Sequence, residues 1–268
     1  MPVQELRVAF FQTNLVWEDK KQNLAHFERQ FSHLKEPVDL VLLPEMFNTG
    51  FSINPEKYAE NMEGESIAYL KDKAKSLQAV LIASLLVKAG KDFFNRLLTV
   101  HPDGRVEPYD KRHLFRLSEE FKIISGGSRR LIVNVKGWKI LPLICYDLRF
   151  PVWSKNTFTS GNYEYDVLVF VANWPESRTK VWKTLLAARA MDNQAYTIGV
   201  NRIGDDGFGT YHSGDSMALD PKGNIIASAP EGKESVNFVT LSRQDLELYR
   251  ESFTVGLDWD RFTIDLNP

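Results

Sequence analysis

The 268-residue chain contains a single cysteine, which excludes an internal disulfide and gives no sign of an oxidising compartment. It has no apolar run long enough to span a membrane. Its first residues lack the basic and apolar segments of a signal peptide. Its formal net charge of −2 gives no reason to expect a nucleic acid or an anionic membrane as a partner. We therefore expect a cytoplasmic protein that binds neither.

The five histidines are scattered and, with one cysteine, show no spacing typical of metal ligands. The glycine-rich stretch at 204–209 has no phosphate-loop lysine, and we interpret it as a mobile loop. We therefore expect no metal and no cofactor. Because no linker, repeat or low-complexity segment divides the chain, residues 1–268 are predicted to be a single domain that ends in an extended tail at about 253–268.

The composition is that of an ordinary globular protein, 43% hydrophobic and 25% charged, with enough length for a substantial core. Apolar positions three and four residues apart predict helices, and short unalternated apolar runs predict strands covered on both faces. Helices are expected at 23–35, 63–78, 179–193 and 244–252. Strands are expected at 8–13, 38–43, 80–87, 93–101, 106–109, 131–135, 139–144, 165–172, 195–200, 216–220, 225–229 and 236–241. This alternation predicts an α/β protein with mixed sheets between helical layers.

The only cysteine, Cys145, ends the apolar run at 139–144. A charged turn follows, and Pro151 to Trp153 could begin a helix. A thiol at the carboxyl end of a strand lies at the edge where α/β sheets bind ligands. A helix N-terminus beyond the thiol would also lower its pKa. A lone cysteine at a strand end is, however, commonly a small buried hydrophobe, so other residues must decide.

Two further segments carry charged groups at strand ends. Glu45 follows the strand at 38–43, where a buried carboxylate is either paired or has a raised pKa suited to a general base. Lys111 follows the hairpin strand at 106–109, among basic residues flanked by aromatic ones. Taken singly, Glu45 could cap a helix or form a salt bridge, and the Lys111 segment could be a surface loop. Together with Cys145, these residues supply a carboxylate, an ammonium and a thiol, in that order along the chain and each at or near the end of a predicted strand.

Six short motifs surround these residues: Leu43-Pro44-Glu45-Met46, Asp110-Lys111-Arg112-His113-Leu114-Phe115, Ile144-Cys145-Tyr146-Asp147-Leu148-Arg149-Phe150-Pro151, Ala172-Asn173-Trp174-Pro175, Ala188-Arg189-Ala190-Met191-Asp192-Asn193-Gln194 and Asn201-Arg202. They resemble those of the nitrilase superfamily, the carbon–nitrogen hydrolases with a Glu-Lys-Cys triad. Within it they are most similar to the ω-amidases, which hydrolyse the terminal amide of short dicarboxylic acid monoamides. The resemblance implies a four-layer α-β-β-α sandwich with two mixed sheets, usually dimerised so that the layers continue across the interface.

The resemblance also implies a role for each residue of the triad. Cys145 would attack the amide carbon as a thiolate. Glu45 would take the thiol proton, pass it to the leaving ammonia and then activate the hydrolytic water. Lys111, with the backbone N–H of Tyr146, would hold the oxyanion of the tetrahedral intermediate.

A second glutamate of the family pattern would hydrogen-bond Lys111 and help to place the substrate. Glu120 matches this position by spacing better than Glu119, and either could instead be a solvent-facing acid of the loop or short helix at 117–127.

The resemblance also makes Arg149, four residues beyond the nucleophile, the candidate for binding a substrate carboxylate, and a guanidinium suits bidentate carboxylate recognition. It could equally form an internal salt bridge with Asp147. Trp174 and Phe47 are candidate aromatic walls of a small pocket, and both could equally be core. Arg178 is a weaker second candidate for the substrate's acid.

Other functions are compatible with parts of this pattern. A cysteine–histidine hydrolase would use His113 or His212 as its base, although papain-like and caspase-like signatures are absent. A non-catalytic α/β binding protein is a distant alternative. Nitrilases, N-carbamoyl amino acid hydrolases and deaminated glutathione amidases share the triad. The resemblance implies an ω-amidase-type homodimer that acts on a small amide, such as 2-oxoglutaramate or 2-oxosuccinamate, through a cysteine thioester.

Overall fold

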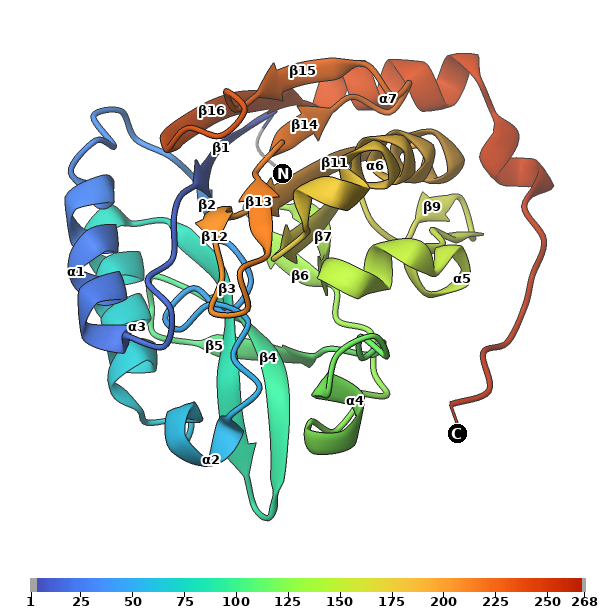
Figure 1. Cartoon of the computed structure of the whole chain (residues 1–268). Coiled ribbons are helices and arrows are strands. Elements are labelled where there is room, and N and C mark those ends of the chain that lie inside the picture. Colours follow the sequence, from blue (N-terminus) through green and yellow to red (C-terminus); the bar gives the residue numbers. More distant parts are fainter. Residues whose placement is uncertain (1–3, 267–268) are drawn as a thin grey trace.

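Two six-stranded sheets lie face to face in the middle of the fold, with helices outside both of them (Figure 1). The computed structural model of the chain describes residues 4–266. The first sheet has the strand order β16-β1-β2-β3-β4-β5 and the second β15-β14-β11-β10-β7-β6. Each sheet contains parallel and antiparallel pairs, so the predicted α-β-β-α sandwich with two mixed sheets is confirmed.

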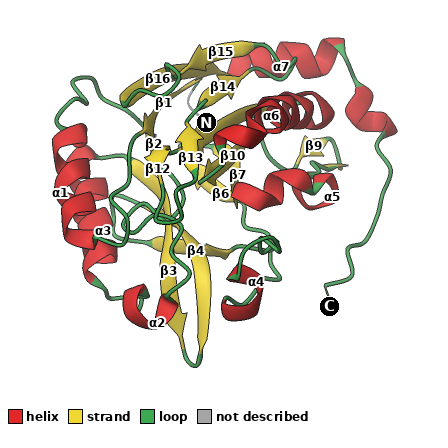
Figure 2. Ribbon diagram, in the orientation of Figure 1, coloured by secondary structure: helices red, strands yellow, loops and turns green. Residues whose placement is uncertain are grey.

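The elements follow the predicted alternation of strands and helices (Figure 2). The first sheet comprises β1 (Glu5–Gln12), β2 (Leu40–Leu42), β3 (Val80–Ala89), β4 (Asp92–Val100), β5 (Val106–Asp110) and β16 (Ser235–Ser242). The second comprises β6 (Val133–Val135), β7 (Trp138–Ile144), β10 (Val167–Ala172), β11 (Tyr196–Asn201), β14 (Met217–Leu219) and β15 (Ile225–Ser228). Two small hairpins are β8 (Phe158–Thr159) with β9 (Asn162–Tyr163) and β12 (Ile203–Asp205) with β13 (Tyr211–Ser213). The helices are α1 (Lys20–Phe31), α2 (Pro55–Tyr58), α3 (Glu65–Leu77), α4 (Glu120–Ile123), α5 (Pro151–Ser154), α6 (Thr179–Asn193) and α7 (Arg243–Ser252).

Alternate residues of the first sheet serve two different cores. On β1, Val8 and Phe10 belong to the core shared with the second sheet. Phe11 points the other way and packs against Phe27 and Phe31 of α1. Both faces of the strand are therefore buried, and this explains why its sequence does not alternate between apolar and polar residues.

The second sheet is covered by α6, which packs closely on β11. A Cβ atom at Gly199 of β11 would lie 2.5 Å from Leu186 Cδ1 and 2.6 Å from Trp182 Cζ2. Only glycine leaves room there, so the helix can lie directly on the strand. This contact sets the distance between the second sheet and its helical layer.

The carboxyl ends of the parallel strands meet at one edge of the sandwich. In the first sheet β2 and β3 run parallel, and β5 has the same direction because it is antiparallel to β4, as β4 is to β3. In the second sheet β7, β10 and β11 run parallel. Glu45, Lys111 and Cys145 follow the ends of β2, β5 and β7. The topology thus brings three distant segments to the edge where ligand sites form.

Local differences from the predicted elements are small. The stretch 204–209, predicted as a loop, contributes its first residues to the β12–β13 hairpin. Beyond α7, a 3₁₀ turn at Val255–Asp258 precedes an extended segment on the outside of the molecule (Figure 1). The predicted tail continues to residue 268, and its last two residues lie outside the described part. Within residues 4–266, no helix is long and apolar enough to cross a membrane.

Candidate active site

Lys111 lies at the centre of a buried charge cluster between the sheets. Its Nζ atom donates hydrogen bonds to Glu45 Oε1 at 2.9 Å and to both carboxylate oxygens of Glu120, at 2.9 and 3.1 Å. All three side chains are at most 1% exposed. Burial alone would lower the pKa of Lys111, but the negative charges of Glu120 and Glu45 outweigh it and raise that pKa. Lys111 therefore stays an ammonium and cannot act as a base at neutral pH.

Glu120, rather than Glu119, is the second glutamate of this cluster. Its Oε2 atom also accepts the backbone N–H of Phe115 at 2.6 Å. Burial raises the pKa of Glu120, and the opposing charge of Lys111 only partly offsets that rise. Glu119 is exposed and pairs with Lys122 at 2.9 Å. Of the two interpretations of this loop, the structure places Glu120 in the cluster and Glu119 at the surface, on the exposed rim of the cavity that holds Cys145.

Two asparagines fix the carboxylate of Glu45. Asn95 of β4 donates to Oε1 at 2.8 Å, and the backbone N–H of Asn173 donates to Oε2 at 2.8 Å. The Asn173 amide also donates to the Glu45 carbonyl at 2.7 Å. Asn95 is not predicted as a site residue, because its only signal in the sequence is a polar side chain in an apolar strand. Asn173 was noted only as part of a motif.

Cys145 has an unusual backbone conformation. It begins the 3₁₀ helix Cys145–Arg149 directly after β7, and its φ of 41° lies in the left-handed region, where non-glycine residues are rare. Such strain is found most often at functional sites, where the surrounding structure maintains it. The side chain is partly exposed, and its Sγ atom lies 3.8 Å from the carbonyl oxygen of Asn173. The thiol is therefore aimed by its backbone and not sealed in the core.

The expectation of a low thiol pKa is wrong. Burial raises the pKa of Cys145 well above its usual value, the negative charge of Glu45 raises it further, and Lys111 opposes this only in part. The short helix beyond it, α5, begins six residues later and has a single turn. The resting group is a neutral thiol, so a nearby base must remove its proton before it can attack.

Asp147 joins the cysteine segment to the lysine segment. Its carboxylate accepts hydrogen bonds from Tyr109 Oη at 2.7 Å, from the backbone N–H of His113 at 3.0 Å and from the backbone N–H of Ile144 at 3.1 Å. It forms no ion pair with Arg149 within the described chain, so the predicted alternative of a salt bridge between them is wrong. The buried carboxylate instead holds the Cys145 segment against the Lys111 segment.

The histidines do not provide a base for the thiol. His113 Nδ1 lies 2.8 Å from Asp147, and its ring stacks on Phe150 with centroids 3.7 Å apart. His212 faces the carbonyl oxygen of Gly204 at 3.2 Å. Neither ring bonds Cys145 among residues 4–266, whereas the negative charge of Glu45 acts on the thiol and, after burial, does most to raise its pKa.

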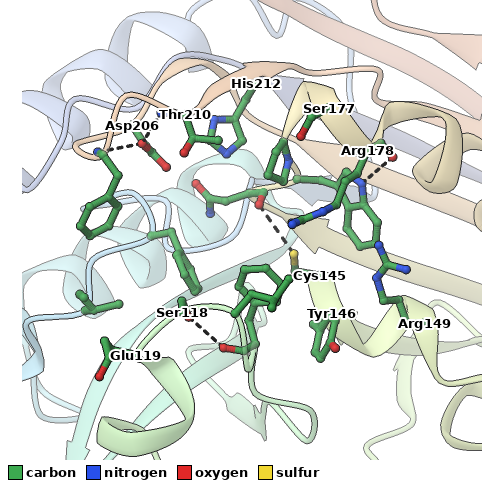
Figure 3. A pocket seen from close by; sticks show the side chains of 18 of the residues that line it. Ser118, Glu119, Cys145, Tyr146, Arg149, Ser177, Arg178, Asp206, Thr210 and His212 are labelled. Carbon is green, nitrogen blue, oxygen red and sulfur yellow. Dashed lines mark hydrogen bonds between the residues drawn. The ribbon is translucent and has the colours of Figure 1, made fainter.

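A cavity of about 560 Å³ opens over the thiol (Figure 3). Tyr146, Arg149 and Trp174 line it, whereas Phe47, a candidate wall residue, does not. Phe47 is fully buried beneath α1, with its ring 5.6 Å from that of Phe27. The turn after β2 directs it into the helix-facing core, and Phe51 contributes to the cavity wall in its place.

Two guanidinium groups reach this cavity without a carboxylate partner. Arg149 lies over the ring of Trp174 at 5.0 Å, and Arg178 over the ring of Phe115 at 5.4 Å. Within the described residues neither forms an ion pair. In Figure 3, Arg178 reaches towards Cys145, while Arg149 lies to one side of it. The weaker candidate for a substrate's acid is thus the one that points at the thiol.

A thiol beside a buried carboxylate–ammonium pair, at the mouth of a cavity between two sheets, is the arrangement of a hydrolase that uses a cysteine nucleophile. The chain belongs to the carbon-nitrogen hydrolase family, whose sequence profile matches residues 7–251.

Similar proteins cover nearly the whole chain. It is 42% identical to the protein named "Omega-amidase YafV" of Yersinia enterocolitica, over 97% of this chain and 98% of that one. It is 29% identical to a "2-oxoglutaramate amidase" of Bacillus subtilis, over 92% and 95%. The crystal structure of XC1258 from Xanthomonas campestris, described as a CN-hydrolase superfamily protein with an arsenic adduct in the active site, has a TM-score of 0.96 and 38% identity, and covers 98% of this chain and 100% of that one.

Proposed function

We propose that this protein is an ω-amidase, which hydrolyses the terminal amide of small dicarboxylic acid monoamides such as 2-oxoglutaramate or 2-oxosuccinamate. The observation that carries the proposal is the pair of unpartnered guanidinium groups, Arg149 and Arg178, in the cavity that holds the Cys145 thiol. A carboxylate bound there would satisfy a cation that otherwise faces water. The name of the YafV relative supports the same substrate class.

In the proposed acylation step, Glu45 takes the proton of the Cys145 thiol as the sulfur attacks the amide carbon. The oxyanion is held by the ammonium of Lys111 and the backbone N–H of Tyr146. Glu45 then returns the proton to the amide nitrogen, the carbon–nitrogen bond breaks, and ammonia leaves. The raised pKa of Cys145 supports this order, because the thiol needs a base.

In the proposed deacylation step, a water molecule takes the place of ammonia and attacks the thioester. Glu45 accepts a proton from that water and then protonates the leaving sulfur, which releases the dicarboxylic acid. Glu120 holds Lys111 throughout and keeps the oxyanion site charged.

The test is a side-by-side assay of 2-oxoglutaramate, 2-oxosuccinamate, succinamate, an N-carbamoyl amino acid and a simple nitrile, with intact-mass detection of a thioester on Cys145. We expect ammonia from the monoamides and an acyl adduct that is lost in Cys145→Ala. Turnover of only the nitrile or only the carbamoyl compound would refute the assignment. Unchanged function of a folded Cys145→Ala protein would instead favour the non-catalytic alternative.

We also propose that the chain acts as a single domain and as a homodimer in the cytoplasm. The continuous core shared by both sheets supports the single domain, and the unpaired thiol of Cys145 supports a reducing compartment. Light scattering of the purified protein at micromolar concentration tests the dimer, and a mass of one chain would contradict it.

A further inference from the structure

The cavity has two ends of different chemistry, and they lie on either side of Cys145. Arg149 lies on one side of the thiol in Figure 3, and Asp206, Thr210 and Ser118 lie on the other. Two apolar side chains of the cavity wall adjoin these residues, Leu117 next to Ser118 and Phe208 beside Asp206, and we call this part of the cavity the apolar end. Nothing in the proposed hydrolysis of a primary amide uses this end.

The proposed substrates are too small to fill the cavity. A molecule such as 2-oxoglutaramate has about ten non-hydrogen atoms, and even if each took the ~30 Å³ of a liquid water molecule they would need about 300 Å³. The cavity measures about 560 Å³. Ammonia, the leaving group of a primary amide, is no larger than water and gains nothing from apolar walls.

The apolar end exposes large side chains that the fold holds in place. Phe208 is 60% exposed and Leu117 is 77% exposed. The ring of Phe208 meets Trp17 edge-on, with centroids 5.1 Å apart. Exposed apolar groups gathered at one place commonly mark a binding surface.

The loop that carries Phe208 is built to keep it there. The Asp206 carboxylate accepts the backbone N–H groups of Phe208 at 2.8 Å and Thr210 at 2.9 Å. Gly207 lies so close to Trp17 that a Cβ atom would come within 2.1 Å of that ring. The loop is therefore fixed against Trp17, and the position of Phe208 is a defined part of the cavity wall.

We propose that the apolar end is a subsite for the amine side of a secondary amide, so that the enzyme also hydrolyses monoamides whose nitrogen carries an apolar alkyl or arylalkyl group. This rests on the proposed function, because it takes the acyl chain and its carboxylate to lie towards the arginines. The substituent on nitrogen then extends away from them, past Cys145, to Phe208 and Leu117. The chemistry is unchanged: the sulfur–carbon bond forms, the carbon–nitrogen bond breaks, and the amine leaves with the proton returned by Glu45.

The test compares succinamate with N-benzylsuccinamate on the purified protein, with succinate and benzylamine quantified by liquid chromatography. We expect both to be hydrolysed. The ratio of kcat/KM for the benzyl amide to that for the primary amide should fall roughly 10-fold in Phe208→Ala and in Leu117→Ala, because each removes part of the apolar wall. Leu248→Ala, which removes a similarly exposed side chain from α7, should leave the ratio unchanged.

Hydrolysis of succinamate without any hydrolysis of N-benzylsuccinamate by the unmodified protein would overturn the subsite and leave the proposed function standing. An unchanged ratio in both variants would also overturn it. So would a change in mass by light scattering in Leu117→Ala together with no secondary-amide turnover, since the apolar end would then be an interface between copies. Hydrolysis of the benzyl amide but of no primary monoamide would support the subsite and contradict the proposed function.

Discussion

At the scale of single residues, one cation is shared by two carboxylates: Lys111 bonds both Glu45 and Glu120. One carboxylate is then available to exchange a proton while the other keeps the ammonium charged. Glu45 suits the first role because its charge acts on Cys145, and Glu120 suits the second because both of its oxygens bond Lys111. In the proposed mechanism, proton transfer and charge stabilisation therefore fall to different carboxylates.

This division predicts opposite outcomes for two neighbouring glutamates. Glu120→Gln should lower kcat about 100-fold, because Lys111 loses a charged partner beside the oxyanion. It should also lower the free energy of unfolding by about 1–3 kcal/mol, because buried hydrogen bonds weaken. Steady-state ammonia release and urea unfolding measure the two effects. Glu119→Gln is the control, and a comparable loss of kcat there would contradict the assignment.

The neutral state of Cys145 predicts how it reacts with alkylating agents. Because its pKa is raised, the thiolate is a small fraction at every pH from 6 to 9, so the rate of iodoacetamide labelling should keep rising with pH across that range. Intact mass at timed intervals measures the rate. A plateau below pH 8 would show a thiolate already formed in the resting enzyme, contrary to the proposed role of Glu45.

At the scale of elements, Glu234 ties the β15–β16 connection to β1 and α1. Its carboxylate accepts hydrogen bonds from Thr13 Oγ1 and the backbone N–H of Asn14, both at 3.0 Å, and lies 3.1 Å from His26. The hydrogen bond with His26, with those of Asn14 and Thr13, lowers the pKa of Glu234 to about 2. One surface carboxylate thus holds three elements together.

Because the pKa of Glu234 is lowered, the stability that its contacts contribute depends on pH. The unfolded chain binds the proton near the ordinary value of 4.5, and the folded chain only near 2. The contribution to stability is therefore complete above about pH 5 and is lost as the pH falls towards 2. Glu234→Gln should flatten the change of unfolding free energy between pH 5 and 3, as measured in urea. An identical slope in both proteins would contradict this.

Some residues of the candidate site can be predicted from sequence patterns, and others cannot. Glu45, Lys111 and Cys145 could be predicted because each follows a strand, and strand ends converge by topology. Asn95 could not, because its partner is 50 residues away and an asparagine inside a strand has no pattern of its own. The pKa of Cys145 was predicted in the wrong direction because local sequence showed a helix start, whereas burial and a distant carboxylate decide it.

At the scale of the whole molecule, the site is divided between the two sheets. The first sheet and the loops after it supply Glu45, Asn95, Lys111 and Glu120, and the second supplies Cys145 with its neighbours. The catalytic geometry therefore depends on how the sheets pack on each other, and not on either one alone.

Two neighbouring residues of β3 test this dependence. Ile82 faces the second sheet and Leu81 faces the helical layer, and both are fully buried. Replacing either with alanine should lower the free energy of unfolding by about 2–5 kcal/mol. Only Ile82→Ala should also lower kcat in the absence of denaturant, because it loosens the contact between the sheets. Equal kcat in the two variants would contradict a site that depends on sheet packing.

The left-handed backbone at Cys145 lowers the stability of the fold at the residue that the proposed activity requires. A side chain in that conformation costs about 1 kcal/mol or more relative to glycine, which adopts it freely. A chain with glycine at this position should survive longer in urea than the natural one and yet hydrolyse nothing. Mutations selected for stability alone would therefore tend to remove the proposed nucleophile, and only selection for turnover would retain it.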